Sequence, residues 1–79
     1  MVLVAQIIVD VPLMQTDRPY SYLIPEAMQD QIALGMRVHV PFGKGNRLLQ
    51  GFVIGFEEQE DLRDFPELKP IAELLDYEP

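Results

Sequence analysis

Two tyrosines in one short segment are the first candidates for ligand chemistry in this chain. Tyr20 and Tyr22 flank Ser21 and follow Arg18. On a strand the two rings would project to the same face, about 7 Å apart. Two aromatic rings beside an arginine can form a stacking platform for nucleic-acid bases. The competing interpretation is that both rings pack in the core, with their hydroxyls at its rim, as buried tyrosines commonly do.

A second candidate is the segment Pro41-Phe42-Gly43-Lys44, in which the glycine and the lysine would contact the ligand. Gly43 lets another molecule approach the main chain closely, because it has no Cβ. Lys44 adds a positive charge, so the pair could hold a phosphate or a sugar hydroxyl. The other residues that define a phosphate-binding loop are missing. Residues 41–44 are equally typical of the start of an ordinary hairpin loop with a solvated lysine.

The remaining polar side chains give weaker indications. Lys69 is one of two bases among residues 57–79, and it is either a ligand contact or an ordinary charge partner for Glu67 or Glu73. His39 is predicted to be a surface residue. With one histidine and no cysteine, neither a nucleophile–base pair nor a metal-ligand set can be assembled. The 79-residue chain alone is therefore not expected to be an enzyme or to hold a metal.

Length, composition and charge predict one small domain over residues 1–79. An apolar share of 48% is typical of a folded chain. The sequence contains neither a signal peptide nor an apolar run long enough to span a membrane, which predicts a cytoplasmic location. The net charge of −7 comes from residues 57–79, whereas residues 31–56 carry bases and no acid. This distribution excludes a broad duplex-DNA footprint and leaves localised anion binding open.

Alternation and turn residues predict a mainly β domain. We expect strands at 3–11, 20–24, 36–40, 48–56 and 68–75, a helical turn at 25–28, a hairpin turn at 44–47 and a solvated acidic loop at 57–66. The last strand is ambiguous with a helical turn, and Pro70 favours the strand. Five short strands with little helix indicate a small twisted β-barrel or sandwich.

Strand 48–56 has an unusual distribution of residues between its faces. Phe52, Ile54 and Phe56 are predicted to share one face, and Gly51, Val53 and Gly55 the other. Two glycines on one face predict a sharp bend, as at a barrel corner.

Several of these segments, taken together and in order, resemble a known family. They are Ile7-Ile8-Val9-Asp10-Val11-Pro12, Arg18-Pro19-Tyr20-Ser21-Tyr22-Leu23-Ile24-Pro25, Gly35-Met36-Arg37-Val38-His39-Val40-Pro41-Phe42-Gly43, Gln50-Gly51-Phe52-Val53 and Glu67-Leu68-Lys69-Pro70-Ile71. The pattern is similar to the N-terminus of the primosomal replication-restart helicases (primosomal protein N′). The resemblance implies a piece cut from the N-terminus of a longer, ATP-dependent 3′→5′ helicase that reloads the replication machinery at stalled forks.

The resemblance also implies a fold and a site. The fold is a small OB-like barrel that recognises the 3′ end of the nascent leading strand. The implied 3′-end site consists of Tyr20, Ser21, Tyr22, Gly43 and Lys69. From their charge and position, Arg18 and Lys44 are added as candidate phosphate contacts. Where the family often has an aspartate between the two aromatic residues, this chain has Ser21, which keeps hydrogen-bonding capacity without the charge.

The resemblance extends to partners and cofactors. Expected partners are single-stranded DNA 3′ ends, forked DNA, the other domains of the helicase, and primosome and single-strand-binding proteins, with no membrane. ATP and zinc belong to parts of the family that this chain lacks, so the chain itself needs no cofactor. The alternative function is a protein-interaction barrel that docks a basic partner through its acidic C-terminal third and does not bind DNA.

Overall fold

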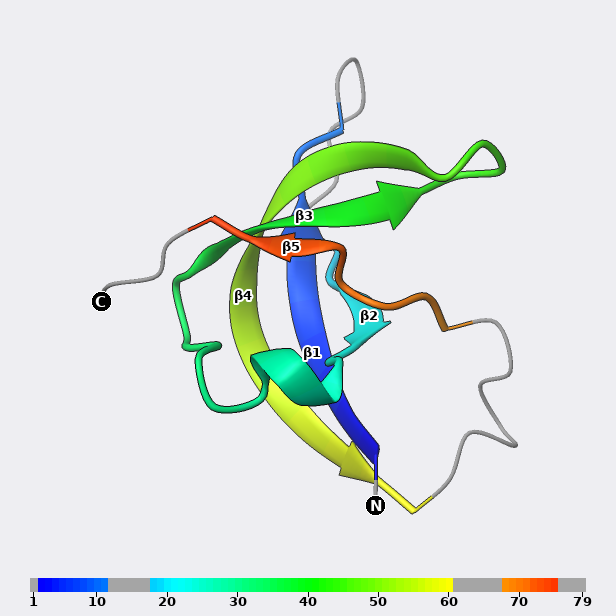
Figure 1. Ribbon diagram of the computed structural model, residues 1–79. Helices are drawn as coiled ribbons and strands as arrows, with labels where there is room; N and C mark the ends of the chain where they lie inside the picture. Colours follow the sequence, from blue (N-terminus) through cyan, green and yellow to red (C-terminus); the bar gives the residue numbers. More distant parts are fainter. Residues whose placement is uncertain (1, 12–17, 61–67, 76–79) are drawn as a thin grey trace.

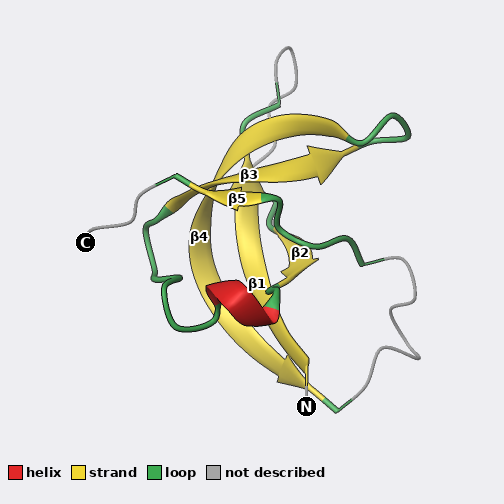
Figure 2. Cartoon of the chain, viewed as in Figure 1, coloured by secondary structure: helices red, strands yellow, loops and turns green. Residues whose placement is uncertain are grey.

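The chain forms one antiparallel five-stranded sheet that curls into a small barrel (Figure 1). The computed structural model describes residues 2–11, 18–60 and 68–75. The elements are β1 (Val2–Val9), β2 (Tyr20–Leu23), the 3₁₀ turn η1 (Glu26–Met28), β3 (Arg37–Phe42), β4 (Arg47–Gln59) and β5 (Glu73–Leu74). Figure 2 shows that strands dominate, with η1 as the single short helical segment of the described residues. The expectation of a mainly β fold with about five strands is confirmed.

The strand order β2-β1-β4-β3-β5 places the long strand β4 at the centre of the sheet. The two ends of this order meet where Leu23 of β2 forms a parallel bridge with Pro70. The Leu23 amide donates to the Lys69 carbonyl (2.9 Å), and the Ile71 amide donates to the Leu23 carbonyl (3.0 Å). Because residues 69–71 lead directly into β5, these bonds close the sheet into the OB-like barrel. We call residues 68–71 the closing segment.

The interior is filled by the inward-facing side chains of the strands, as alternation requires. The fully buried members are aliphatic and come from four strands and the closing segment. They include Ala5, Ile7, Val9, Val38, Val40, Val53, Ile71 and Leu74. The core thus joins all the elements that carry the candidate ligand residues.

β4 bends around this core, and Gly51 explains part of the bend. An added Cβ at Gly51 would lie 2.5 Å from Ile7 Cγ2 and 2.9 Å from the Ile8 carbonyl oxygen, so only glycine fits. Further along, the pairing with β1 shifts register between Gln6 and Ile7. The ribbon of β4 is strongly curved over this region (Figure 1), as the two glycines predicted.

Several boundaries differ from the expectations. β1 ends at Val9 rather than at residue 11, and β2 ends at Leu23 rather than at residue 24. β4 continues through Glu57–Gln59, which had been assigned to the acidic loop, because these residues keep pairing with Val2–Val4 of β1; residues 61–66 lie outside the described part. Of the predicted strand 68–75, only Glu73–Leu74 is strand, and Pro70 makes an isolated bridge. β3 does not stop before Pro41 but includes it. Pro25 precedes the helical turn as its N-cap.

The described part of the chain has no helix that is long and apolar enough to cross a membrane.

Candidate nucleic-acid site

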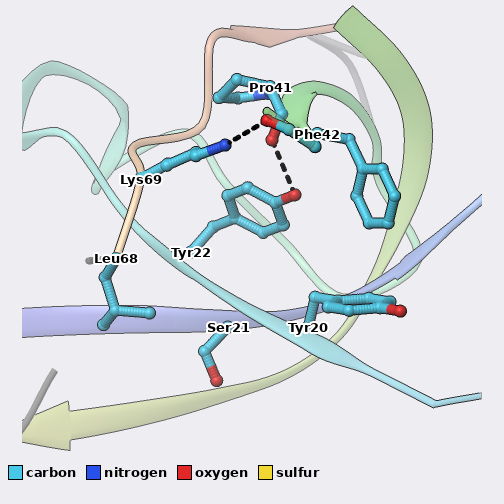
Figure 3. A pocket seen from close by; sticks show the side chains of 8 residues that line it. Tyr20, Ser21, Tyr22, Pro41, Phe42, Leu68 and Lys69 are labelled. Carbon is cyan, nitrogen blue, oxygen red and sulfur yellow. Dashed lines mark hydrogen bonds between the residues drawn. The ribbon is translucent and has the colours of Figure 1, made fainter. Parts of the chain in front are cut away.

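One pocket of about 410 Å³ opens where β2, the end of β3 and the closing segment meet (Figure 3). Its size lies within the roughly 300–1,000 Å³ range of small-molecule sites. Its lining residues are Tyr20, Ser21, Tyr22, Pro41, Phe42, Gly43, Leu68 and Lys69. The lining includes all five residues that the sequence analysis assigned to a 3′-end site, from three segments far apart in the chain.

The outer edge of β3 explains why a pocket exists at this place. Its carbonyls at Arg37 and His39 accept main-chain hydrogen bonds from Leu75 and Ala72, both at 2.9 Å. We call this half of the β3 edge, from Arg37 to His39, the closed half. Here the C-terminal segment lies directly against β3, and the main-chain bonds leave no space between them.

Beyond His39 the main-chain ladder between β3 and the C-terminal segment stops, and side chains from β2 and from residue 69 bridge the gap. The Tyr22 hydroxyl donates to the Pro41 carbonyl (2.8 Å), and the Lys69 ammonium donates to the Gly43 carbonyl (2.8 Å). We call this half, from Pro41 to Gly43, the open half. Because a side chain holds the two backbones further apart than a main-chain bond does, the separation creates the pocket (Figure 3).

Pro41 fits this position for a physical reason. Backbone groups alternate in direction along a strand, so those of Pro41 point the same way as those of His39, away from β4. The N–H that proline lacks would therefore face the open half rather than the ladder with β4. The strand can pass through Pro41, in register with Leu48 of β4, without losing a sheet hydrogen bond.

The rings of Tyr20 and Phe42 stand at the mouth of the pocket. They form an edge-to-face pair with centroids 5.2 Å apart and planes at 89°. Such a contact stabilises the orientation of both rings. Tyr20 is half-buried and lies opposite Ile7 in the β1–β2 register. One ring face of this pair is thus held in a fixed orientation at the pocket.

Tyr22 has a different environment from Tyr20. Its side chain is only 5% exposed and belongs to the core, with its hydroxyl bonded to Pro41 at the rim. Burial, with a smaller contribution from Tyr20, raises the pKa of the Tyr22 phenol above its usual value. The interpretation of a core tyrosine with its hydroxyl at the rim therefore describes Tyr22 better than an exposed stacking platform does.

Ser21 points its side chain away from the two tyrosines (Figure 3). Its hydroxyl donates to Gln6 Oε1 at 3.2 Å, on the other face of the sheet. Its main-chain groups point the same way as those of Leu23, away from β1 and toward the closing segment, since direction repeats every second residue. Ser21 therefore contributes main chain rather than its hydroxyl to the pocket.

Lys69 supplies the charge of the site. Of the eight described lining residues, it is the one with a basic side chain. Its ammonium has three donors, and one is bonded to the Gly43 carbonyl, which leaves donors for a ligand. Of the two expected acidic partners, Glu73 lies beside His39 instead, with its Oε2 3.8 Å from His39 Nδ1. Glu67 lies outside the described residues.

Arg18 and Lys44 do not line the pocket. Both side chains are exposed, Arg18 just before β2 and Lys44 in the hairpin turn. The turn itself has the predicted residues, with positive φ at Gly43 (75°) and Asn46 (50°).

The structure adds Pro41, Phe42 and Leu68 to the pocket lining. The sequence analysis included Pro41 and Phe42 in its second candidate segment without a ligand role, and it did not include Leu68. For Phe42 a signal existed, because it precedes Gly43 directly and is a large apolar residue at the start of a predicted turn. Leu68 had no comparable signal, since its position depends on the bonds between Leu23 and residues 69–71.

Fold and site together define a class: a small OB-like barrel with an open pocket lined by aromatic side chains and one lysine. Comparison with known proteins agrees with this class. Residues 6–79 match the family model of the PriA 3′ DNA-binding domain (3′BD), and the chain belongs to this family. It is also similar to the replication restart protein PriA of Bacillus subtilis (strain 168), with 44% identity over 75 residues. The match covers 95% of this chain and 9% of that relative's length.

Proposed function

We propose that this domain binds the 3′ end of a DNA strand, with the terminal nucleotide in the pocket between β2, the open half of the β3 edge and the closing segment. The observation that carries the proposal is that Tyr20, Gly43 and Lys69 line the same pocket, in a chain of the 3′ DNA-binding domain family. In the replication-restart setting, the ligand is the nascent leading strand at a stalled fork.

The terminal base has one suitable surface in this arrangement. Tyr20 and Phe42 fix each other's ring planes, whereas Tyr22 is buried and bonded through its hydroxyl. We therefore assign base stacking to Tyr20, supported by Phe42. Base stacking on an aromatic side chain contributes roughly 1–3 kcal/mol. Stacking does not depend on base edges, so binding should be nearly independent of sequence.

The sugar and phosphate have partners on the other side of the pocket. Gly43 carries no Cβ, and the space around its Cα is open, so the ribose 3′-hydroxyl can approach its main chain. Lys69 lies beside it and can donate to the preceding phosphate with the hydrogens that the Gly43 carbonyl does not use. The main chain of Ser21 completes the site from β2.

The chain itself acts as a binding module in this proposal. ATP hydrolysis, strand separation and zinc binding would reside in the other domains of the longer protein, and contacts with primosome and single-strand-binding proteins belong to the same cytoplasmic setting. The exposed bases Arg18 and Lys44 would contact phosphates further from the end, and their contribution should depend strongly on salt.

The test is fluorescence anisotropy of this chain with one labelled single-stranded oligonucleotide that ends in either a 3′-hydroxyl or a 3′-phosphate, at low salt. Preference for the hydroxyl is expected, because an additional phosphate would have to fit against the Gly43 main chain. Tyr20→Leu should weaken the binding of the hydroxyl form. Equal binding of both oligonucleotides would mean general strand contact and would contradict end recognition.

A further inference from the structure

An apolar strip on the outer surface of the barrel has no role in the pocket. Phe52, Ile54 and Phe56 of β4 are 42%, 52% and 45% exposed. Leu34, at 64% exposed, lies beside this strand, because the next residue, Gly35, donates its amide to the Val53 carbonyl (2.8 Å). We call these four residues the outer strip.

The outer strip lies on the central strand of the sheet, where exposed large apolar side chains require an explanation. The core does not use them, since none belongs to the buried cluster or to the side chains packed against it. The alternation of β4 places Val53 inside and Phe52 and Ile54 outside. The pocket does not use them either, because its lining comes from β2, residues 41–43 and residues 68–69.

The two ends of the strip differ in charge: the exposed Arg37 of β3 lies opposite Phe52, whereas the end beyond Phe56 is acidic. The acidic end favours a protein partner over nucleic acid. β4 continues past Phe56 into Glu57 and Glu58, and Glu60 follows; all three are exposed. A phosphate backbone would be repelled at this end of the strip. A protein surface with apolar residues and neighbouring lysines or arginines would be complementary to it.

We propose that the outer strip docks against another domain of the same polypeptide in the longer replication-restart protein. The length of chain outside this domain supports that occupant, since the match covers only 9% of the Bacillus subtilis relative. The inference rests on the proposed function, which makes this chain one domain of such a protein. Docking through β4 leaves the pocket open, so the domain can hold a DNA end while it is fixed to the rest of the protein.

The test compares hydroxyl-radical footprinting of the 79-residue chain with that of the longer protein, read by mass spectrometry. Phe52 and Ile54 should be oxidised several-fold more slowly in the longer protein. Leu48 is the internal reference, because it is also exposed (56%) on β4 but lies about 13 Å before Phe52 along the strand. Its oxidation rate should be the same in both samples.

Two variants test whether the slower oxidation depends on the outer strip itself. In the longer protein, Phe52→Thr should restore fast oxidation of Ile54, and the matched control Leu48→Thr should not. Equal rates for Phe52 in the two wild-type samples would overturn the proposal. If Phe52 and Ile54 become protected from oxidation when the concentration of the 79-residue chain is raised, the strip mediates self-association. If they become protected when oligonucleotide is added, the strip binds DNA. Either result would overturn the proposal.

The two proposals fail separately. Phe52→Thr in the 79-residue chain should leave the preference for a 3′-hydroxyl end unchanged. If that preference is absent from the wild-type chain, the proposed function fails whatever the footprint shows. If the preference is present and the footprint does not change, docking through the strip alone is wrong.

Discussion

The two halves of the β3 edge are the most instructive comparison within this molecule. In the closed half, the carbonyls of Arg37 and His39 accept main-chain bonds from the C-terminal segment. In the open half, the carbonyls of Pro41 and Gly43 accept side-chain bonds from Tyr22 and Lys69, and the Gly43 carbonyl also accepts the Asn46 amide within the hairpin turn (3.2 Å). The carbonyls are satisfied in both halves, but only the second leaves space for a ligand. The ligand pocket thus forms because side-chain groups replace main-chain amides as hydrogen-bond donors between β3 and its neighbours, while the barrel stays closed.

The difference between the two halves also predicts which residues affect stability and which affect ligand binding. Side chains opposite the closed half pack the core and should affect stability. Those that donate to the open half are structural and ligand-contacting at once, so they should affect both stability and binding. The predictions below test this division.

The largest effect on binding is expected from Lys69→Met. Methionine keeps most of the length and apolar contact of lysine but removes the charge and the bond to the Gly43 carbonyl. A hydrogen bond that involves a charged group contributes roughly 1.5–3 kcal/mol, so affinity for a 3′-hydroxyl oligonucleotide should fall about tenfold or more. The control is Lys44→Met, outside the pocket, which anisotropy at low salt should show to be much less affected. Equal losses in the two variants would contradict a specific role for Lys69.

The largest effect on stability is expected from Gly51→Ala. Gly51 pairs with Val38, opposite the closed half, and an added methyl would overlap Ile7 and the main chain of β1. Overpacking of this kind destabilises by roughly 1–3 kcal/mol, which urea denaturation can measure. Gly45→Ala is the control, because nothing lies within 4 Å of an added Cβ there. If the Gly51→Ala protein is as stable as the Gly45→Ala protein, the close approach of β1 and β4 is not as described.

A smaller effect is expected from Tyr22→Phe, which removes one hydroxyl from the open half. The Pro41 carbonyl loses the hydrogen bond from the Tyr22 hydroxyl, and a lost hydrogen bond of this type costs about 1 kcal/mol. The free energy of unfolding should fall by this amount while the ring still packs in the core. Tyr20→Phe, in which no bonded hydroxyl is lost among the described contacts, is the comparison; a loss of stability as large as that of Tyr22→Phe would contradict the role of the Tyr22–Pro41 bond.

The smallest effect is the dependence of stability on alkaline pH. Burial raises the pKa of Tyr22 in the folded state, so above the ordinary tyrosine pKa of about 10 the unfolded chain releases a proton that the folded chain retains. Stability from this group is therefore complete below pH 10 and is lost as the pH rises through the folded-state pKa. Denaturation curves between pH 8 and 11 should show a steeper decline for wild type than for Tyr22→Phe. Parallel declines would contradict the burial of this phenol.

Much of the fold could be predicted because its determinants are local. Alternating apolar residues predicted four strands, and the segment Lys44-Gly45-Asn46-Arg47 predicted the hairpin turn between β3 and β4. The end of β4 could not be predicted in this way, since Glu57–Gln59 are polar and are held in the strand by pairing with β1. For short segments of this kind, tertiary pairing outweighs local preference.

The same distinction between local and tertiary determinants applies to the candidate site. Residue types and a family resemblance placed Tyr20, Gly43 and Lys69 together. They did not indicate that Lys69 donates to Gly43 or that Ser21 turns its hydroxyl to Gln6. Those contacts depend on where the ladder between β3 and the C-terminal segment ends, which is a property of the closed barrel rather than of any one segment.

The most direct test of the central claim is an NMR titration of the ¹⁵N-labelled chain with a short single-stranded oligonucleotide that ends in a 3′-hydroxyl. If the terminal nucleotide occupies the open half, the largest amide shifts should fall on Tyr20–Tyr22, Gly43 and Lys69, with little change at Arg37–His39 or at Phe52–Phe56. Largest shifts on the outer face of β4, or equal small shifts over the whole barrel, would contradict the placement of the DNA end in this pocket.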